Sequence, residues 1–145
     1  MNTAIDNILD SKAGVDTLPL RVGAGVVFAA HGAQKLFGWF GGYGLEGTGA
    51  WMDSIGLSPG YLMALMAGGA EFVGGLMLIL GALVRPSAAV LAVTMLVAIF
   101  TVHFENGLFM SNNGYEFALA LFVISAALAI RGAGDYSIDQ MISKR

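Results

Sequence analysis

Residues 67–89, AGGAEFVGGLMLILGALVRPSAA, join the end of one long apolar run to the start of the next. The first run spans residues 61–84 and the second spans residues 86–104. At a rise of about 1.5 Å per residue, each run is long enough to cross roughly 30 Å of hydrocarbon as an α-helix. Because only Arg85 lies between them, the two runs are expected to form an antiparallel helical hairpin.

The composition of the whole chain fits segments that lie in lipid. Of its 145 residues, 57% are hydrophobic and only 12% are charged, and the mean hydropathy is +0.74. A water-soluble domain of this size carries charge on about a quarter of its residues. We therefore expect an integral membrane protein, with the lipid bilayer as its main partner.

Two further apolar runs complete the pattern. Residues 19–37 follow the polar N-terminal segment, and residues 115–130 form a shorter run near the other end of the chain. The sequence thus predicts an all-α fold, an integral membrane four-helix transmembrane bundle over residues 18–131. Residues 1–17 and 132–145 are expected to be tails outside the membrane.

Lysine and arginine are distributed unevenly between the two sides of this bundle. Only Lys35 falls on the side of the glycine- and aromatic-rich connection 38–60 and the polar loop 105–114. Short flanking segments rich in Lys and Arg stay in the cytoplasm. Both tails are therefore predicted to be cytoplasmic. The positive residues on their side are Lys12, Arg21, Arg85, Arg131, Lys144 and Arg145.

Charge and cysteine content exclude several function classes. A net charge of -3 and a pI near 5.1 provide no basic surface for nucleic acid, so no nucleic-acid partner is expected. Without cysteine, the chain has neither thiol–disulfide chemistry nor thiolate metal ligands of its own. Any redox role therefore requires a centre supplied by another molecule. The N-terminal segment lacks the basic start of a secretory signal and is expected to be retained as a mobile or interfacial tail.

Glu71 is the most informative polar position. It lies midway along the run 61–84, near the predicted midplane of the bilayer. A carboxylate at that depth is costly unless it faces protein and has a partner. Small residues share its helical face, as is typical where transmembrane backbones pack closely, so Glu71 is expected to point into the bundle. The small residues of this packing face are Ala64, Ala67, Gly68, Gly74 and Gly75.

The first apolar run offers partners for Glu71 at a similar depth. His31 and Lys35 are four residues apart on one helical face, and Gln34 lies beside them. Two further polar residues, at the outer ends of the third and fourth runs, are placed to close the cluster. We advance six residues as a ligand-binding site: His31, Gln34, Lys35, Glu71, His103 and Glu116.

Each of these residues also has a purely structural interpretation. Glu71 can form a buried ion pair or hydrogen bond that only fixes helix packing, and the same interpretation applies to His31. Lys35 is expected to extend to the outer interface, and His103 and Glu116 to anchor that interface or cap loops. No metal-binding motif is present at local spacing, so no metal site is predicted.

Three segments carry a resemblance to a known family: HGAQKLFGWFGG (31–42), AGGAEFVGGLMLILGALVRPSAA (67–89) and RGAGDYSID (131–139). Over residues 19–139 the chain resembles the DoxX family of small four-helix bacterial membrane proteins. The resemblance implies a multi-pass location in the bacterial cytoplasmic (inner) membrane. The positions that match the family pattern are His31, Lys35, Gly38, Glu71, Gly74, Gly75 and Arg85.

The resemblance also implies a redox context. DoxX is named after a subunit of a thiosulfate:quinone oxidoreductase, and relatives have been linked to membrane-associated redox complexes. The fold is more remotely similar to four-helix quinone-linked thiol oxidoreductases. Since this chain lacks cysteine, only a quinone pocket could be shared with them.

Together, the residues and the resemblance favour an accessory or anchor subunit of a membrane redox system. We expect such a subunit to be non-catalytic by itself rather than an enzyme. It would hold a quinone or another small apolar molecule against His31 and Glu71, next to a redox-enzyme partner. A small-solute or proton-coupled transporter is one alternative, and a purely structural membrane protein is another. Bundles this small and rich in Gly and Met often associate, so a homo-oligomer is a further expectation.

Overall fold

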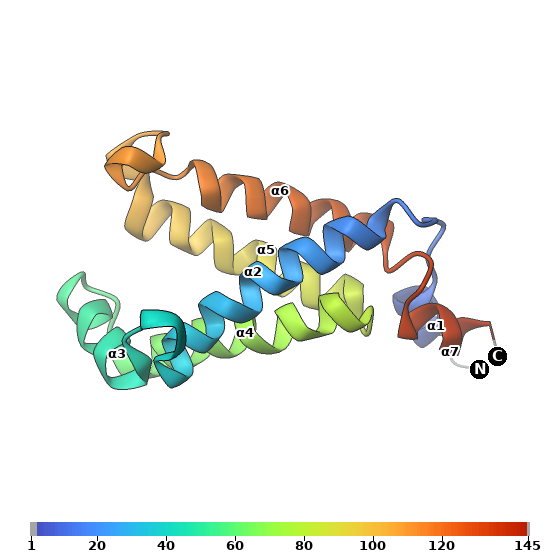
Figure 1. Cartoon of the computed structure of the whole chain (residues 1–145), viewed down its shortest axis with the longest axis horizontal. Helices are drawn as coiled ribbons and strands as arrows, with labels where there is room; N and C mark the ends of the chain where they lie inside the picture. Colours follow the sequence, from blue (N-terminus) through green and yellow to red (C-terminus); the bar gives the residue numbers. More distant parts are fainter. Residues whose placement is uncertain (1–2, 145) are drawn as a thin grey trace.

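The computed structural model describes residues 3–144, and within that range the chain is helical without any strand. The long helices are α2 (Thr17–Phe37), α4 (Gly60–Leu80), α5 (Val84–Ala98) and α6 (Glu116–Arg131). The short helices are α1 (Thr3–Leu9), α3 (Gly44–Ser54) and α7 (Ile138–Ser143). The four long helices form the body of the molecule, with α1 and α7 at one end and α3 at the other (Figure 1). The all-α prediction is confirmed.

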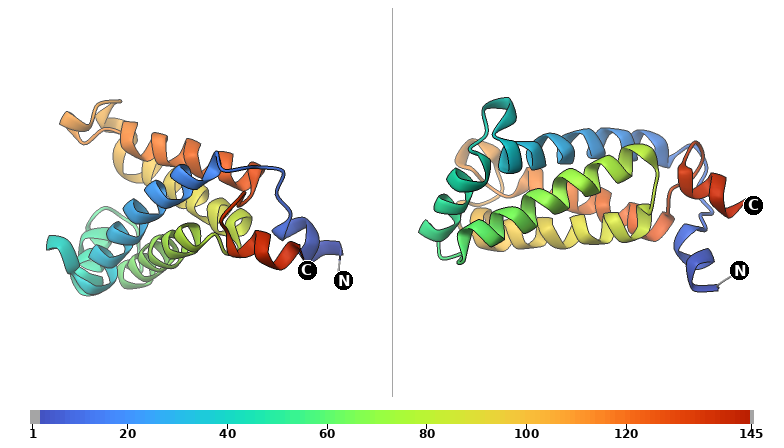
Figure 2. Two further views of the ribbon diagram at one scale, coloured as in Figure 1. Left: turned by 45° about the vertical axis from the view of Figure 1, so that its right-hand side comes forward. Right: turned by 90° about the horizontal axis from the view of Figure 1, so that it is seen from below.

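The long helices associate as two pairs. Helix α2 packs along α4, and α5 packs along α6, while α4 also contacts α5 (Figures 1 and 2). Apolar side chains from all four helices form one core, in which Leu78, Val84, Leu91 and Leu128 are completely buried. Toward the end that carries α3, the two pairs diverge (Figure 2). The bundle is therefore packed at one end and spread at the other.

Glycines set the close approach of α4 to its neighbours. A Cβ on Gly75 would lie 2.7 Å from the carbonyl oxygen of Gly25 in α2, too close for any side chain. Gly74 faces α5, where the Leu91 side chain would lie 3.0 Å from such a Cβ. Gly68 faces side chains of α2, with the nearest atoms also at 3.0 Å. All three glycines of the predicted packing face thus lie at helix–helix contacts.

The second helix is shorter than the sequence predicts. Helix α4 ends at Leu80 rather than at residue 84, because Gly81 adopts a left-handed conformation (φ 69°). Helix α5 begins at Val84, so Arg85 lies inside α5 and the prediction that it forms the link is wrong. A distant residue fixes this start. The Asp139 carboxylate accepts hydrogen bonds from two backbone N–H groups there, at 2.7 and 2.9 Å.

Both segments predicted as tails are folded against this end of the bundle. Arg21 is completely buried (0% exposed), although the sequence placed it among the positive residues that flank the membrane on the cytoplasmic side. Its guanidinium donates to the carbonyl oxygen of Leu78 at 3.2 Å and to those of Asp135 and Tyr136 at 3.0 and 3.1 Å. Carbonyls of this kind offset the cost of burying a charge. Arg21 therefore holds the segment after α6 against the core.

Two further arginines close the same end. Arg85 donates to two carbonyl oxygens in the last turn of α6, at 3.0 and 2.5 Å. Arg131 forms an ion pair with Asp16, and α1 contacts α7 beside it (Figure 1). We call this end, defined by Arg21, Arg85 and Arg131, the arginine end. Arg145, which belongs to the same charge count, lies outside the described residues.

Two helices in the described range are long and apolar enough to cross a membrane: Gly60–Leu80, with a mean hydropathy of 1.8, and Val84–Asn106, with 2.1. The second continues α5 through a π-helical turn, Ile99–His103, and a 3-10 turn, Phe104–Asn106. Helix α2 carries several charged and polar residues, and α6 is only 16 residues long. Four membrane crossings and cytoplasmic termini stay predictions.

Candidate ligand-binding site

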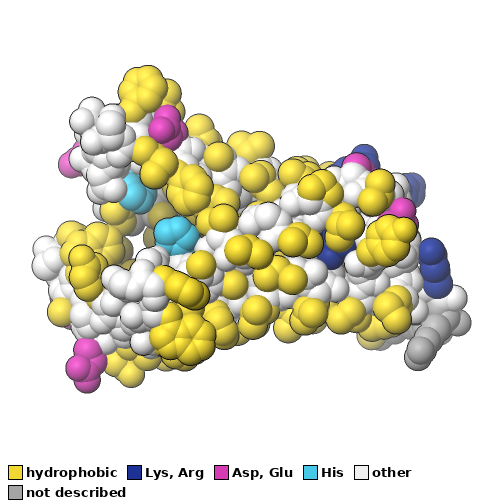
Figure 3. All heavy atoms as spheres, in the orientation of Figure 1, with side chains coloured by type: hydrophobic (Ala, Val, Ile, Leu, Met, Phe, Trp, Pro, Cys, Tyr) yellow, Lys and Arg dark blue, Asp and Glu magenta, His cyan; other side chains and the backbone are white. Residues whose placement is uncertain are grey.

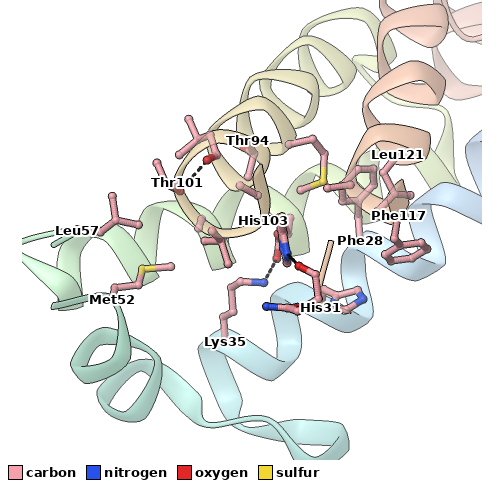
Figure 4. Close-up of a pocket in the computed structure, with 18 of the residues that line it drawn as sticks. Phe28, His31, Lys35, Met52, Leu57, Thr94, Thr101, His103, Phe117 and Leu121 are labelled. Atoms are coloured by element: carbon pink, nitrogen blue, oxygen red, sulfur yellow. Dashed lines mark hydrogen bonds and ion pairs between the residues drawn. The ribbon is translucent and has the colours of Figure 1, made fainter. Parts of the chain in front are cut away.

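A cavity of about 580 Å³ lies between the two helix pairs, at the end opposite the arginine end (Figure 4). Three buried core side chains close it on the inner side: Phe28, Met95 and Leu121. Figure 3 shows its opening between the spread ends of the bundle, with a histidine side chain on either side. We call this region, lined by the polar residues His31, Lys35, Glu71 and His103, the open end.

The cavity walls are mostly apolar and partly aromatic. Phe117 lines it from α6, and Trp51 and Met52 line it from α3. The glycine- and aromatic-rich connection 38–60 therefore supplies part of a cavity wall. An apolar pocket of several hundred cubic ångströms with a few polar groups is typical of a small-molecule site.

Lys35 and Glu71 form an ion pair inside this cavity. Lys35 Nζ lies 2.6 Å from Glu71 Oε2, and the two side chains are 25% and 6% exposed. The expectation that Lys35 extends to the outer interface is wrong. An unpaired carboxylate at this depth would be costly, and turning the lysine inward gives it a partner.

His103 lines the cavity from the end of a π-helical turn that follows α5. The regular α-helical bonds of α5 end at Ala98, and residues 99–103 form a π-helical turn, a feature that often occurs at functional sites. His103 Nδ1 lies 2.9 Å from the carbonyl oxygen of Asn113. His103 thus lines the cavity, as expected of a ligand-site residue. It also holds the loop before α6, as expected of a residue that caps a loop.

His31 faces the cavity from α2, one helical turn before Lys35 (Figure 4). Its ring lies beside Phe117 of α6, with the ring centroids 6.1 Å apart. His31 therefore stands at the gap between the two helix pairs, where its ring can reach a ligand in the cavity.

The other two predicted site residues do not line the cavity. Gln34 donates a hydrogen bond to the carbonyl oxygen of Phe40 at 3.2 Å and so supports the turn after α2. Glu116 accepts a hydrogen bond from the backbone N–H of Met110 at 3.1 Å and supports the loop before α6. The structure brings four of the six predicted residues together and gives these two structural contacts instead.

Two threonines of the cavity were not predicted from the sequence. Thr94 and Thr101 both line it, seven residues apart along α5 and its π-helical turn (Figure 4). This spacing places two hydroxyls on one face of an otherwise apolar run, a signal that could have been recognised. Within residues 3–144, no group of His, Asp and Glu side chains is arranged to hold a metal ion.

The family model for DoxX proteins matches residues 17–104, which include all four polar residues that define the open end. The chain belongs to the DoxX family. This membership confirms the resemblance seen in the sequence and makes the chain a membrane protein. No solved structure matches it significantly.

Relatives span nearly the whole length of the chain. The Bacillus subtilis (strain 168) protein named "Putative oxidoreductase CatD" is 33% identical over 130 residues, which cover 90% of this chain and 89% of that protein. Inner membrane protein YqjF of Escherichia coli (strain K12) is 34% identical over 137 residues, with 90% and 95% covered. An uncharacterized Haemophilus influenzae protein is 31% identical over 134 residues, with 91% and 86% covered.

Proposed function

We propose that this DoxX protein is the membrane subunit of a redox system and binds a quinone in its cavity. The observation that carries the proposal is an apolar, partly aromatic cavity whose polar groups gather at the open end. The family and the name of the Bacillus subtilis relative supply the redox context. Because the chain has no cysteine, we assign electron exchange to a partner enzyme and binding to this chain.

The residues of the cavity fit such a molecule. The aromatic rings of Phe28 and Phe117 suit a flat ring, and the apolar wall suits a hydrocarbon tail. Lys35 Nζ has three N–H groups and gives one to Glu71, so two are free for a ligand oxygen. A bound quinone would supply two-electron, two-proton chemistry, and this chain would position its oxygens.

We also propose that all four long helices cross the membrane, with the arginine end in the cytoplasm. Helices α2 and α4 have 21 residues each and would span about 31 Å. The arginine end holds the described positive residues other than Lys35, as the distribution of charge across bacterial membranes requires. Exposed aromatic side chains at the open end, Trp39, Phe40 and Tyr43, suit the opposite interface.

Binding is tested by tryptophan fluorescence of the purified protein in lipid nanodiscs. The chain has two tryptophans, of which Trp51 lines the cavity, so a Trp39→Phe background reports on the cavity alone. Decyl-ubiquinone should quench Trp51 in a saturable manner. Lys35→Met and His31→Ala should each weaken binding about tenfold, because each removes a group that can donate a hydrogen bond to a quinone oxygen.

Two controls separate binding in the cavity from quinone dissolved in lipid. Ala98→Phe fills the cavity from α5 and should abolish saturable quenching. Glu116→Gln lies outside the lining and should leave quenching unchanged. If Lys35→Met and His31→Ala bind the quinone as tightly as the parent protein, the proposed site is wrong.

The partner is tested by purifying the tagged protein from its native membrane in mild detergent. A redox enzyme that co-purifies, identified by mass spectrometry, supports the subunit role. Solute flux into proteoliposomes that disappears in Glu71→Gln would instead support a transporter, in which a membrane carboxylate takes part in transport.

A further inference from the structure

The polar groups of the cavity differ in what they can still donate or accept. A quinone carbonyl oxygen only accepts hydrogen bonds, whereas the hydroxyl groups of the reduced form, a hydroquinone, also donate them. The hydrogen-bond state of the cavity walls therefore determines which redox form fits better. The wall formed by α5 and its π-helical turn is the informative one.

On that wall, the hydroxyl hydrogens are already in use. Thr94 donates to the carbonyl oxygen of Val90 at 2.9 Å, and Thr101 donates to that of Val97 at 2.6 Å. Each is a bond to the carbonyl four residues earlier in the same helix. A threonine oxygen whose hydrogen is engaged in this way still has a lone pair. Thr94 and Thr101 can therefore only accept a hydrogen bond from a ligand.

His103 is held in the same state by the loop. Its Nδ1 lies 2.9 Å from the carbonyl oxygen of Asn113, and a carbonyl oxygen can only accept, so Nδ1 carries the hydrogen. In the neutral ring, Nε2 then carries the lone pair. Asn113 has a left-handed backbone (φ 56°), and Asn106 donates to the same oxygen at 3.1 Å. The loop thus presents His103 to the cavity as an acceptor.

Glu71 adds an acceptor on the opposite wall. Its Oε2 accepts from Lys35 at 2.6 Å, and a carboxylate has further lone pairs with which it can accept from a ligand. Lys35 beside it supplies the donors. A hydroxyl group placed here can donate to Glu71 and accept from Lys35 at once, whereas a carbonyl oxygen can use only Lys35.

From this arrangement we propose that the cavity binds the dihydroxy-aromatic form of its ligand, a hydroquinone, in preference to the quinone. The inference rests on the proposed function and adds the redox form that is held. A quinone that spans the cavity turns one carbonyl oxygen toward Thr94, Thr101 and His103, none of which can donate to it. A hydroquinone turns a donor toward the same three acceptors. A subunit with this preference retains the reduced carrier and releases the oxidised one.

The test compares three ligands of nearly equal shape by calorimetric titration of the protein in nanodiscs under argon, with partition into empty nanodiscs subtracted. They are decyl-ubiquinol, decyl-ubiquinone and the dimethyl ether of the quinol, which keeps the ring and lacks the O–H donors. We expect the quinol to bind about tenfold tighter than the other two, the worth of one matched hydrogen bond in a desolvated site.

Two variants assign the preference to the α5 wall. Thr101→Val keeps the shape of the side chain and removes its oxygen, and His103→Phe keeps a flat ring and removes Nε2. In each, the ratio of quinol to quinone affinity should fall about threefold or more, while size-exclusion profiles confirm folding. Glu116→Gln, which lies outside the cavity, should keep the full ratio.

The outcomes distinguish this inference from the proposed function. Equal binding of quinol and quinone by the parent protein, or a preference that persists in both variants, overturns the inference and leaves the quinone site standing. Binding of the dimethyl ether as tightly as the quinol also overturns it, because donors would then be irrelevant. If none of the three ligands binds, the proposed function and the inference both fail.

Discussion

The arginine end and the open end of the same bundle use polar residues in opposite ways. At the arginine end, the terminal guanidinium nitrogens of buried Arg21 and the carboxylate of Asp139 are matched to backbone groups, and only Nε of Arg21 lacks a partner within residues 3–144. At the open end, His31, Lys35 and Glu71 line a cavity, and the hydrogen bond between Lys35 and Glu71 leaves two amine hydrogens of Lys35 for a ligand. A small bundle can hold a ligand-sized cavity at one end if the other end supplies the stability. Function and stability are thus separated along its length.

The first prediction concerns the arginine end and has the largest expected effect on stability. Arg21→Met removes the donors to three carbonyl oxygens in a largely buried site, so the free energy of unfolding in detergent should fall by about 3 kcal/mol. Chemical unfolding followed by circular dichroism measures it. Lys12→Met, an exposed residue of the same end, should change stability by less than about 0.5 kcal/mol.

Arg21→Met also tests whether the arginine end and the open end act independently. If Arg21→Met folds at low temperature, its affinity for the quinol should stay within about twofold of the parent value, since residues far apart with no shared partners act independently. A large loss of binding together with intact folding would show that the two ends are coupled and that the comparison fails.

The second prediction tests the contact between α7 and α5. Asp139→Ala removes the acceptor for two N–H groups at the start of α5 and should cost about 2 kcal/mol. Asp139→Asn keeps one acceptor oxygen and should cost about half as much. Unfolding curves of the two variants provide the check. Equal stability of Asp139→Ala and the parent protein would show that Asp139 of α7 does not stabilise the start of α5.

These contacts at the arginine end also show what the sequence could not predict. The four helices followed from hydropathy, and the inward direction of Glu71 followed from the small residues around it on its own helix. The burial of Arg21 and the capping role of Asp139 depend on residues more than fifty positions away. Local pattern carries no information on such pairings.

The open end was predictable to a similar, partial degree. Charge and depth indicated His31, Lys35, Glu71 and His103, which the fold brings around one cavity. The sequence offered Lys35 both as a partner of Glu71 and as a residue that extends to the interface, and the structure shows the first of these. Gln34 and Glu116 were included by position, yet nearby backbone groups hold them outside the cavity lining.

The third prediction separates binding from stability at the open end. Glu71→Gln keeps the shape of the side chain and an oxygen that can accept from Lys35, which is partly exposed to the cavity. Stability should therefore change by only about 1 kcal/mol, while quinol affinity falls about tenfold, because the carboxylate oxygen that accepts from the quinol hydroxyl is lost. Unfolding and titration of the same preparation measure both. Loss of stability without loss of affinity would show that the Lys35–Glu71 ion pair only stabilises helix packing.

The fourth prediction has the smallest expected effect. Gln34→Ala and Glu116→Gln alter loop contacts outside the cavity, so each should change ligand affinity by less than about twofold and stability by at most about 1 kcal/mol. Titration against the parent protein checks this. Affinity losses as large as that of Glu71→Gln would show that Gln34 and Glu116 belong to the ligand-binding site.

The central claim is that the bundle is open between its helix pairs at one end and sealed at the other. The chain has no native cysteine, so single cysteines can report this directly in nanodiscs. Ala98 lines the cavity, and Ala88, on the same helix, is completely buried (0% exposed). A water-soluble maleimide should label Ala98→Cys rapidly, more slowly with quinol bound, and leave Ala88→Cys unlabelled until denaturant is added. Equal labelling at the two positions, or labelling of Ala88→Cys alone, would contradict the account.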